Sequence, residues 1–140
     1  MDHSTLVKNF IDQIWNQNHF EHIDSFLHPQ FKDHSLPPAL SADKEGLIKW
    51  IVGTGHSFEH QTMIENQVTG EDMSIIKIKM HLKHIGRWRD IEPTGKELET
   101  TGYRQFKIQD GKIIGHWALI DGQAIEQALN NTAHGCKIAE

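Results

Sequence analysis

The amino-acid sequence predicts an α+β fold, a curved antiparallel sheet with helices on one face. Apolar residues recur at helical spacing up to about residue 53 and alternate at spacing two from about residue 58, so helices precede strands. The pair Asp110-Gly111 lies between two alternating segments and is typical of a type I′ hairpin turn. Helices segregated from hairpin-connected strands predict a sheet covered on one side.

Three helices are expected before any strand. Ser4 is the expected N-cap of the first, Pro29 closes a short second helix because proline disfavours the helical conformation of the preceding residue, and Ser41 caps a third that ends at Gly53. The apolar positions of the three helices are Leu6, Val7, Phe10, Ile11, Ile14 and Trp15, then Ile23, Phe26 and Leu27, then Leu47, Ile48 and Ile51.

The strands are expected at about 58–68, 74–85 and 97–109, with the second hairpin strand at 112–120. Alternation defines which residues share a face. The inner faces are Ile76, Ile78, Met80, Leu82 and His84; Gly102, Arg104, Phe106 and Ile108; and Ile113, Gly115, Trp117, Leu119 and Asp121. Alternation places His116 on the outer face unless a β-bulge re-aims it.

Two charged residues, Arg104 and Asp121, therefore fall on apolar faces. A buried charge must be paired or neutralised, so such positions are candidates for a functional site. Two structural alternatives stay open. Asp121 precedes a final helix at about 122–129 and can be its N-cap, and Arg104 can pair with a neighbouring carboxylate.

The chain of 140 residues fits one domain, residues 1–130, followed by a flexible tail, 131–140. Its net charge is −5 and it has no run of Lys or Arg, which argues against a nucleic-acid partner. No apolar stretch has the length of a membrane span or signal segment, and the single cysteine, Cys136, has no intrachain partner. A cytoplasmic location is the expectation.

Eleven histidines raise the question of a metal site. His56 and His60 with the intervening Glu59 match an inverted zincin motif, but that chemistry needs both histidines on one helix, and glycines precede them while strand formers follow. We therefore expect no metal and no other cofactor. Cys136 in the polar tail is a poor candidate nucleophile.

Several segments, in order, resemble the SnoaL-like polyketide (ester) cyclases over most of the chain. They are Trp15-Asn16, the segment from Pro29 to His34, His84-Ile-Gly-Arg-Trp88, Pro93-Thr-Gly-Lys96, Phe106-Lys-Ile-Gln-Asp-Gly-Lys-Ile113, and His116-Trp117 with Asp121. The resemblance implies the cone-shaped α+β barrel of nuclear transport factor two and ketosteroid isomerase, with three N-terminal helices on the concave face and a pocket beneath them. The segment from Thr54 to His60 departs from the family pattern.

The resemblance implies cofactor-independent acid/base catalysis on a small-molecule carbonyl ligand, as intramolecular aldol ring closure or isomerisation. Asp121 would be the general acid/base, its pKa raised by desolvation, with His84 and His34 orienting carbonyl groups. The candidate substrate-binding residues are Arg104, Trp88, Trp117, Phe106 and Met80.

Other roles stay open. His34 can equally be a surface or helix-capping residue, and Trp88 and Trp117 can be ordinary core residues. The same pocket could belong to a non-catalytic carrier or sensor, and a pure interaction module is a third alternative. The resemblance also implies a homodimer through the outer sheet face, with His81, Tyr103 and His116 near the contact.

Overall fold

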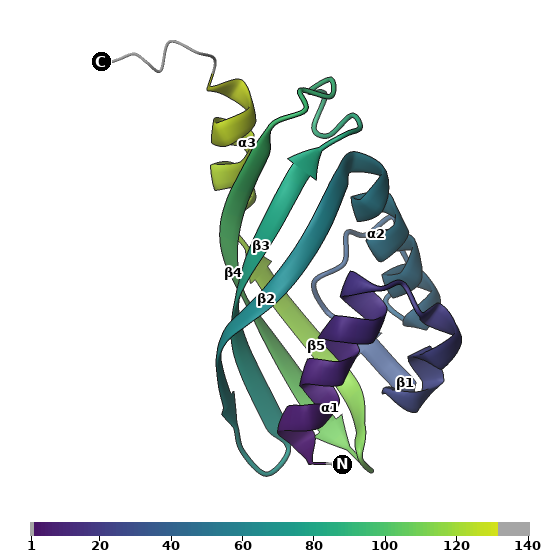
Figure 1. Cartoon of the computed structure of the whole chain (residues 1–140). Helices are drawn as coiled ribbons and strands as arrows, with labels where there is room; N and C mark the ends of the chain where they lie inside the picture. The colour runs from purple at the N-terminus through teal and green to yellow at the C-terminus, as the bar shows by residue number, and fades with distance from the viewer. Residues whose placement is uncertain (1, 132–140) are drawn as a thin grey trace.

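The structure, a computed structural model, describes residues 2–131 (Figure 1). Its elements are α1 (His3–Phe10), the π-helix η1 (Ile11–Asn16), the 3₁₀-helix η2 (Phe20–Ser25), β1 (Leu27–Asp33), α2 (Lys44–Ser57), β2 (Phe58–Thr69), β3 (Met73–His84), β4 (Glu97–Gln109), β5 (Lys112–Ile120) and α3 (Gly122–Asn130). The predicted tail, 131–140, lies outside the described residues except for Asn131. None of the described helices is long and apolar enough to cross a membrane.

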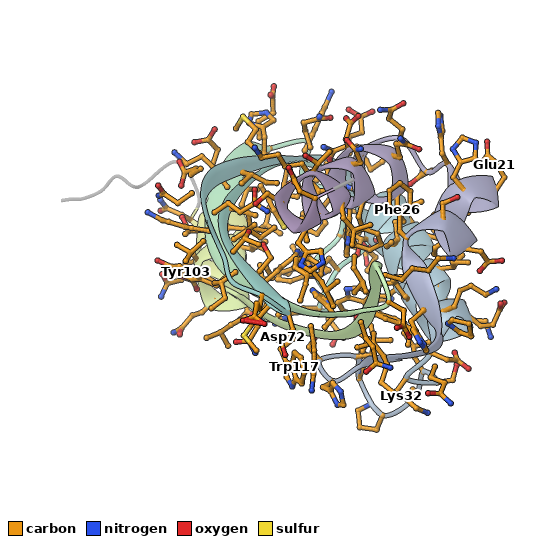
Figure 2. All side chains as sticks on the ribbon, turned by 90° about the horizontal axis from the view of Figure 1, so that it is seen from below. Glu21, Phe26, Lys32, Asp72, Tyr103 and Trp117 are labelled. Carbon is orange, nitrogen blue, oxygen red and sulfur yellow. The ribbon has the colours of Figure 1, made fainter. Side chains whose placement is uncertain are left out.

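One curved sheet of five strands, in the order β1-β5-β4-β3-β2, organises the fold. Viewed end on, the sheet wraps around helices on its concave side, while Tyr103 and Trp117 point outward from the convex side (Figure 2). The core forms between these layers; for example, Phe10 of α1 meets Phe106 of β4 edge to face at 5.9 Å between ring centroids. The predicted α+β fold class is confirmed.

Strand β1 is the element that the sequence prediction missed. The second helix ends at Ser25, and Leu27 begins an edge strand that pairs with β5 in parallel, so the sheet is not wholly antiparallel. Pro29 is tolerated inside β1 because an edge strand need not donate every backbone N–H to a neighbour. The first strand therefore precedes α2 rather than following three helices.

The first and third helices also differ from their predicted ends. Asp2, not Ser4, caps α1 by accepting the N–H of Thr5 at 2.7 Å. Asp43, not Ser41, caps α2, and α2 runs through Gly53 to Ser57. The extra turn of α2 carries additional side chains along the concave face of the sheet, where the cavity described below lies.

The hairpin between β4 and β5 has the predicted turn, with positive φ at both Asp110 (53°) and Gly111 (73°). The alternation of β5 is nevertheless interrupted. Lys107 pairs with Gly115 but Ile108 pairs with Ile113, so Ile114 is an extra residue, a β-bulge.

The bulge exchanges the two faces of β5 after Ile114. His116, Ala118 and Ile120 line the concave side, whereas Trp117 is 38% exposed and Leu119 is 78% exposed. The predicted inner row of Trp117, Leu119 and Asp121 is therefore wrong, and His116, predicted on the outer face, is buried.

Candidate active site

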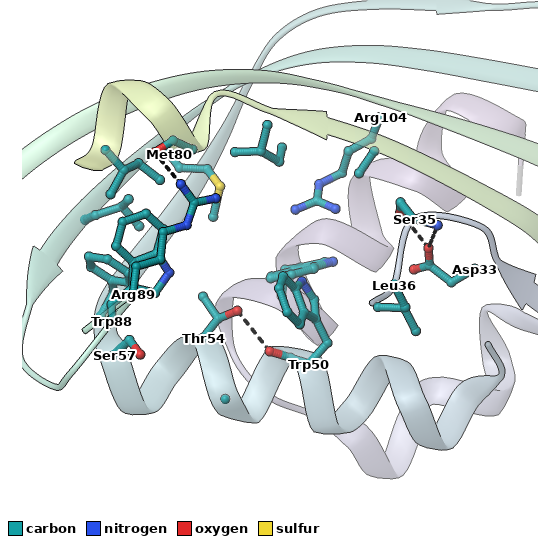
Figure 3. A pocket seen from close by; sticks show the side chains of 18 of the residues that line it. Asp33, Ser35, Leu36, Trp50, Thr54, Ser57, Met80, Trp88, Arg89 and Arg104 are labelled. Atoms are coloured by element: carbon teal, nitrogen blue, oxygen red, sulfur yellow. Dashed lines mark hydrogen bonds between the residues drawn. The ribbon is translucent and has the colours of Figure 1, made fainter. Parts of the chain in front are cut away.

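A cavity of about 570 Å³ lies between the concave face of the sheet, α2 and the start of α3 (Figure 3). Such a volume is typical of small-molecule sites. Its walls are mainly apolar and include Trp15, Trp50, Phe58, Met80, Leu82 and Trp88. Arg104 and Asp33 lie at one end and Arg89 and Trp88 at the other.

Three of the residues predicted for the site line this cavity: Arg104, Trp88 and Met80. Phe106 is fully buried in the core and outside the cavity lining. Most of the polar residues assigned to the expected pocket lie outside this cavity.

Asp121 is exposed and does not line the cavity. Its carboxylate accepts the backbone N–H of Ala124 at 2.9 Å and caps α3, which is the structural alternative that the sequence left open. The expectation that Asp121 lies in the pocket is therefore wrong, because the β5 bulge removes it from the inner row.

His34 and Trp117 lie together on the outside of the sheet, outside the cavity lining. Their rings stack at 4.6 Å with an interplanar angle of 13°. Gly115 leaves room for the Trp117 ring, since a Cβ there would lie 3.1 Å from it. Neither side chain is placed to orient a ligand in the cavity.

His84 is fully buried, yet it too lies outside the cavity lining. Its Nδ1 accepts the backbone N–H of Thr94 at 3.1 Å, which places the ring proton on Nε2. The ring packs against Phe58 at 5.3 Å between centroids. This arrangement anchors the 85–96 loop to β3.

The polar end of the cavity is built on Asp33 and His116, which are register partners on the parallel strands β1 and β5. His116 Nδ1 donates to Asp33 Oδ2 at 2.8 Å, and both side chains are almost completely buried. Asp33 Oδ1 accepts the backbone N–H and the hydroxyl of Ser35 at 2.9 and 2.7 Å. These bonds fix the carboxylate and, through it, the imidazole ring.

Arg104 is the third member of the group. It is 3% exposed, its guanidinium lies 4.3 Å from the centre of the Trp15 ring, and Nη1 faces His116 Nε2 at 3.4 Å. Trp15 reaches this position from the π-helix η1, a type of helical irregularity common at functional sites. Among the described residues, the buried Nε of Arg104 has no hydrogen-bond partner.

The surroundings of Asp33, His116 and Arg104 shift the pKa values of all three groups. Burial opposes ionisation of Asp33, but bonds from His116 and Ser35 outweigh it and hold the pKa of the carboxyl below its usual value. Burial lowers the pKa of His116, with a further contribution from the Arg104 charge, and outweighs the bond to Asp33, which acts in the opposite direction. Burial also lowers the pKa of Arg104 to about 10.

At neutral pH the group is therefore an ionised Asp33, a neutral His116 and a charged Arg104. An ionised carboxylate only accepts, so the proton of His116 is on Nδ1 and its Nε2 carries a lone pair. That nitrogen lies beside a cation in a mainly apolar cavity, which is an arrangement able to accept a proton and to stabilise a negative oxygen.

The sequence prediction did not assign His116 or Asp33 to the site, although the sequence contains a signal for each. Gly115, a glycine within a strand, is a mark of a β-bulge, and the bulge is what turns His116 inward. Asp33 with Ser35 has the spacing of an Asx-turn, which indicates that the carboxylate is held locally.

The histidines of the apparent zincin motif lie on different elements, His56 in the last turn of α2 and His60 in β2. Among the described residues, His19, Glu21 and His22 have ligand atoms within 4.8 Å of one another. This group is on the surface and away from the cavity, so it contributes nothing to the chemistry there.

Comparisons with known proteins agree with the fold. The family profile of the SnoaL-like polyketide cyclases matches residues 5–129. TsrD from Streptomyces laurentii superposes with a TM-score of 0.81 at 20% identity, over 93% of this chain and 98% of that chain. IdmH from Streptomyces antibioticus gives 0.82 at 20% identity, over 91% and 98%.

A SnoaL-like polyketide cyclase from Agrobacterium tumefaciens gives a TM-score of 0.75 at 14% identity, over 91% of this chain and 97% of that chain. No curated protein matches the sequence. Structural likeness at such identities concerns the fold, whereas the profile match spans most of the sequence. The chain therefore belongs to the SnoaL-like polyketide cyclase family.

Proposed function

We propose that this protein is a cofactor-independent enzyme that closes a ring in, or isomerises, a small apolar carbonyl compound, with His116 as its acid/base group. Family membership supports a cyclase- or isomerase-type activity. The observation that carries the proposal is the buried imidazole of His116, which is hydrogen-bonded through Nδ1 to Asp33 and faces Arg104 through Nε2 in a mainly apolar cavity.

The reaction begins when a substrate carbonyl oxygen takes the donors of Arg104 that now face His116 Nε2. The contact between Arg104 Nη1 and His116 Nε2 is long, at 3.4 Å, and therefore weak, so a ligand oxygen can replace it at little cost in free energy. Nε2 then removes a proton from the carbon next to the carbonyl, and Arg104 stabilises the enolate oxygen. Asp33 stabilises the imidazolium that forms.

In ring closure, the enolate carbon attacks a second carbonyl carbon of the same molecule, and the new alkoxide oxygen takes the proton back from His116. In isomerisation, the proton returns to a different carbon of the enolate. Neither route consumes a co-reactant. The cavity contributes by holding the reacting carbons close together, which removes much of the entropic barrier.

Exchange of α-protons for deuterium tests the first step without knowledge of the natural substrate. We expect the protein to catalyse exchange in D2O for members of a panel of aryl ketones and β-dicarbonyl compounds that includes benzoylpropionic acid, read by proton NMR. His116→Gln should slow exchange ~10²–10⁴-fold, the usual contribution of a general base. Asp121→Asn, at an exposed helix cap, should exchange at the wild-type rate.

A wild-type rate in His116→Gln, with a circular dichroism spectrum and melting temperature showing that the variant is folded, would remove His116 from the mechanism. Absence of exchange by the wild-type protein across the whole panel would favour a non-catalytic carrier instead. Below pH 6.5 the wild-type rate should fall as His116 becomes protonated at its lowered pKa.

The homodimer implied by the family remains part of the proposal. Exposed apolar side chains on the convex face of the sheet, including Tyr103, Leu119 and Val68, form the surface that a second copy would cover. His81 is exposed beside Glu97, and His116, expected at this contact, is instead inside.

A further inference from the structure

A tight turn, Trp88 to Ile91, lies at the end of the cavity remote from Asp33. Trp88 and Ile91 exchange two backbone hydrogen bonds of 3.0 and 2.8 Å, and the two central residues, Arg89 and Asp90, have φ angles of 47° and 62°. Such a turn favours Asn and Gly, because a β-carbon is strained at positive φ. Arginine at the first central position departs from this preference, and such departures occur mainly at functional sites.

The strained conformation places the Arg89 side chain in the cavity wall. Its guanidinium lies beside the Trp88 ring (Figure 3), 4.5 Å from the centre of the ring. Nη1 approaches Gly122 O at 3.4 Å and Glu126 Oε1 at 3.3 Å. A Cβ on Gly122 would lie 2.7 Å from Arg89 Nη2. A glycine at the start of α3 therefore leaves the space that the guanidinium occupies.

The partners of Arg89 hold it loosely. Both contacts are longer than the usual N–H···O range, and the side chains of Arg89 and Glu126 are 51% and 45% exposed. Half-exposed ion pairs of this kind are weak and are readily exchanged for another anion. A guanidinium also has five N–H donors in a planar fork, which matches a carboxylate.

We infer that Arg89 binds a carboxylate carried by the ligand, at the end opposite the reacting carbonyl. Resting on the proposed function for the carbonyl end, this assigns the substrate class as an apolar carbonyl compound with a terminal carboxylate. Arg104 and His116 bind the carbonyl group of the ligand, and the apolar walls contact its hydrocarbon part. Arg89, stacked on the Trp88 ring, binds the carboxylate. Glu126 is the competing anion that the ligand displaces.

A matched pair of probes tests the assignment: benzoylpropionic acid and its methyl ester, which differ only in the charge. NMR chemical-shift titration of the labelled protein gives a dissociation constant for each probe without requiring turnover. The wild-type protein should bind the acid about tenfold more tightly than the ester, a preference typical of one charge-assisted contact. In Arg89→Gln, acid and ester should bind with equal affinity.

Arg87→Gln is the control, because it removes the same charge two residues away. Arg87 is exposed, pairs with Asp90 and Glu92, and does not line the cavity, so the preference for the acid should persist. Glu126→Gln should act in the opposite direction and tighten binding of the acid several-fold, since it removes the competitor. A purely structural role for Arg89 would produce no such increase.

The inference is overturned if the wild-type protein does not prefer the acid, if the acid shows no saturable binding at millimolar concentration, or if the preference survives Arg89→Gln. These outcomes are independent of the proposed chemistry. Loss of the preference in Arg89→Gln, combined with wild-type α-proton exchange in His116→Gln, would support the carboxylate site and reject His116 as the base.

Discussion

Replacing Asp33 with asparagine changes one heavy atom and should disable the site. The carboxylate now accepts from Ser35 N, Ser35 Oγ and His116 Nδ1. If the amide oxygen keeps the two bonds from Ser35, the amide N–H group faces His116 Nδ1, so the imidazole must move its proton to Nε2 to avoid two opposed donors. Nε2–H then faces Arg104 Nη1, another donor, and Nε2 can no longer accept a proton.

The magnitude follows from these bonds. Hydrogen bonds to a charged acceptor contribute about 1 kcal/mol more than neutral ones, and one buried mismatch costs about 1–3 kcal/mol, so Asp33→Asn should lose roughly 3–5 kcal/mol of unfolding free energy. The α-proton exchange rate should fall at least ~10²-fold because the base is in the wrong tautomer.

Urea unfolding and α-proton exchange measured on the same preparation test both parts. Ser35→Ala is the matched control, because it removes one bond to Asp33 and leaves the tautomer of His116 unchanged. It should cost only about 1 kcal/mol and little rate. Wild-type stability together with a wild-type exchange rate in Asp33→Asn would refute the reasoning.

Three further predictions concern the pH dependence of stability, the position of Arg89 and the convex face of the sheet. The pKa of His116 in the folded protein lies below its unfolded value of 6.5, so the unfolded state takes up the proton first as the pH falls. The free energy of unfolding should therefore decrease below pH 6.5. In urea unfolding at several pH values, this free energy should depend less on pH in His116→Gln than in the wild-type protein. Gly122→Ala should displace Arg89 and weaken binding of benzoylpropionic acid, but not of its ester, in the NMR titration. Leu119→Glu, at a 78% exposed position, should convert the proposed dimer to a monomer in light scattering; a wild-type protein that is already monomeric would reject the dimer.

The fold could be predicted from the sequence wherever local signals and burial agree. Asp110-Gly111 has the turn chemistry that its positive φ angles require, and the alternation of β3 matches its burial from Ile76 to His84. The prediction failed at β1, because its parallel partner is distant in sequence and Pro29 indicates a helix end as readily as an edge strand. It also failed at the ends of α2, which Asp43 caps and which continues through Gly53 to Ser57 despite the low helix propensity of glycine.

The prediction of the site failed because the register of β5 differs by one residue from strict alternation. Strict alternation through β5 gave Asp121 an inward position and His116 an outward one, and the single extra residue Ile114 reverses the face of every side chain after it. Arg104 was placed correctly because β4 has no bulge before it. The pairing of Asp33 with His116 joins residues 83 positions apart, which periodicity within one strand does not reveal.

The state of the His116 ring tests the central claim most directly. Long-range ¹H–¹⁵N NMR of the histidine side chains distinguishes the two neutral tautomers from the imidazolium, and His116→Gln assigns the signals. At pH 7 we predict a neutral ring with its proton on Nδ1 and an unprotonated Nε2, and a pKa below 6.5. A ring that is charged at pH 7, or neutral with its proton on Nε2, would contradict the account, because His116 could not then accept a proton from a ligand in the cavity.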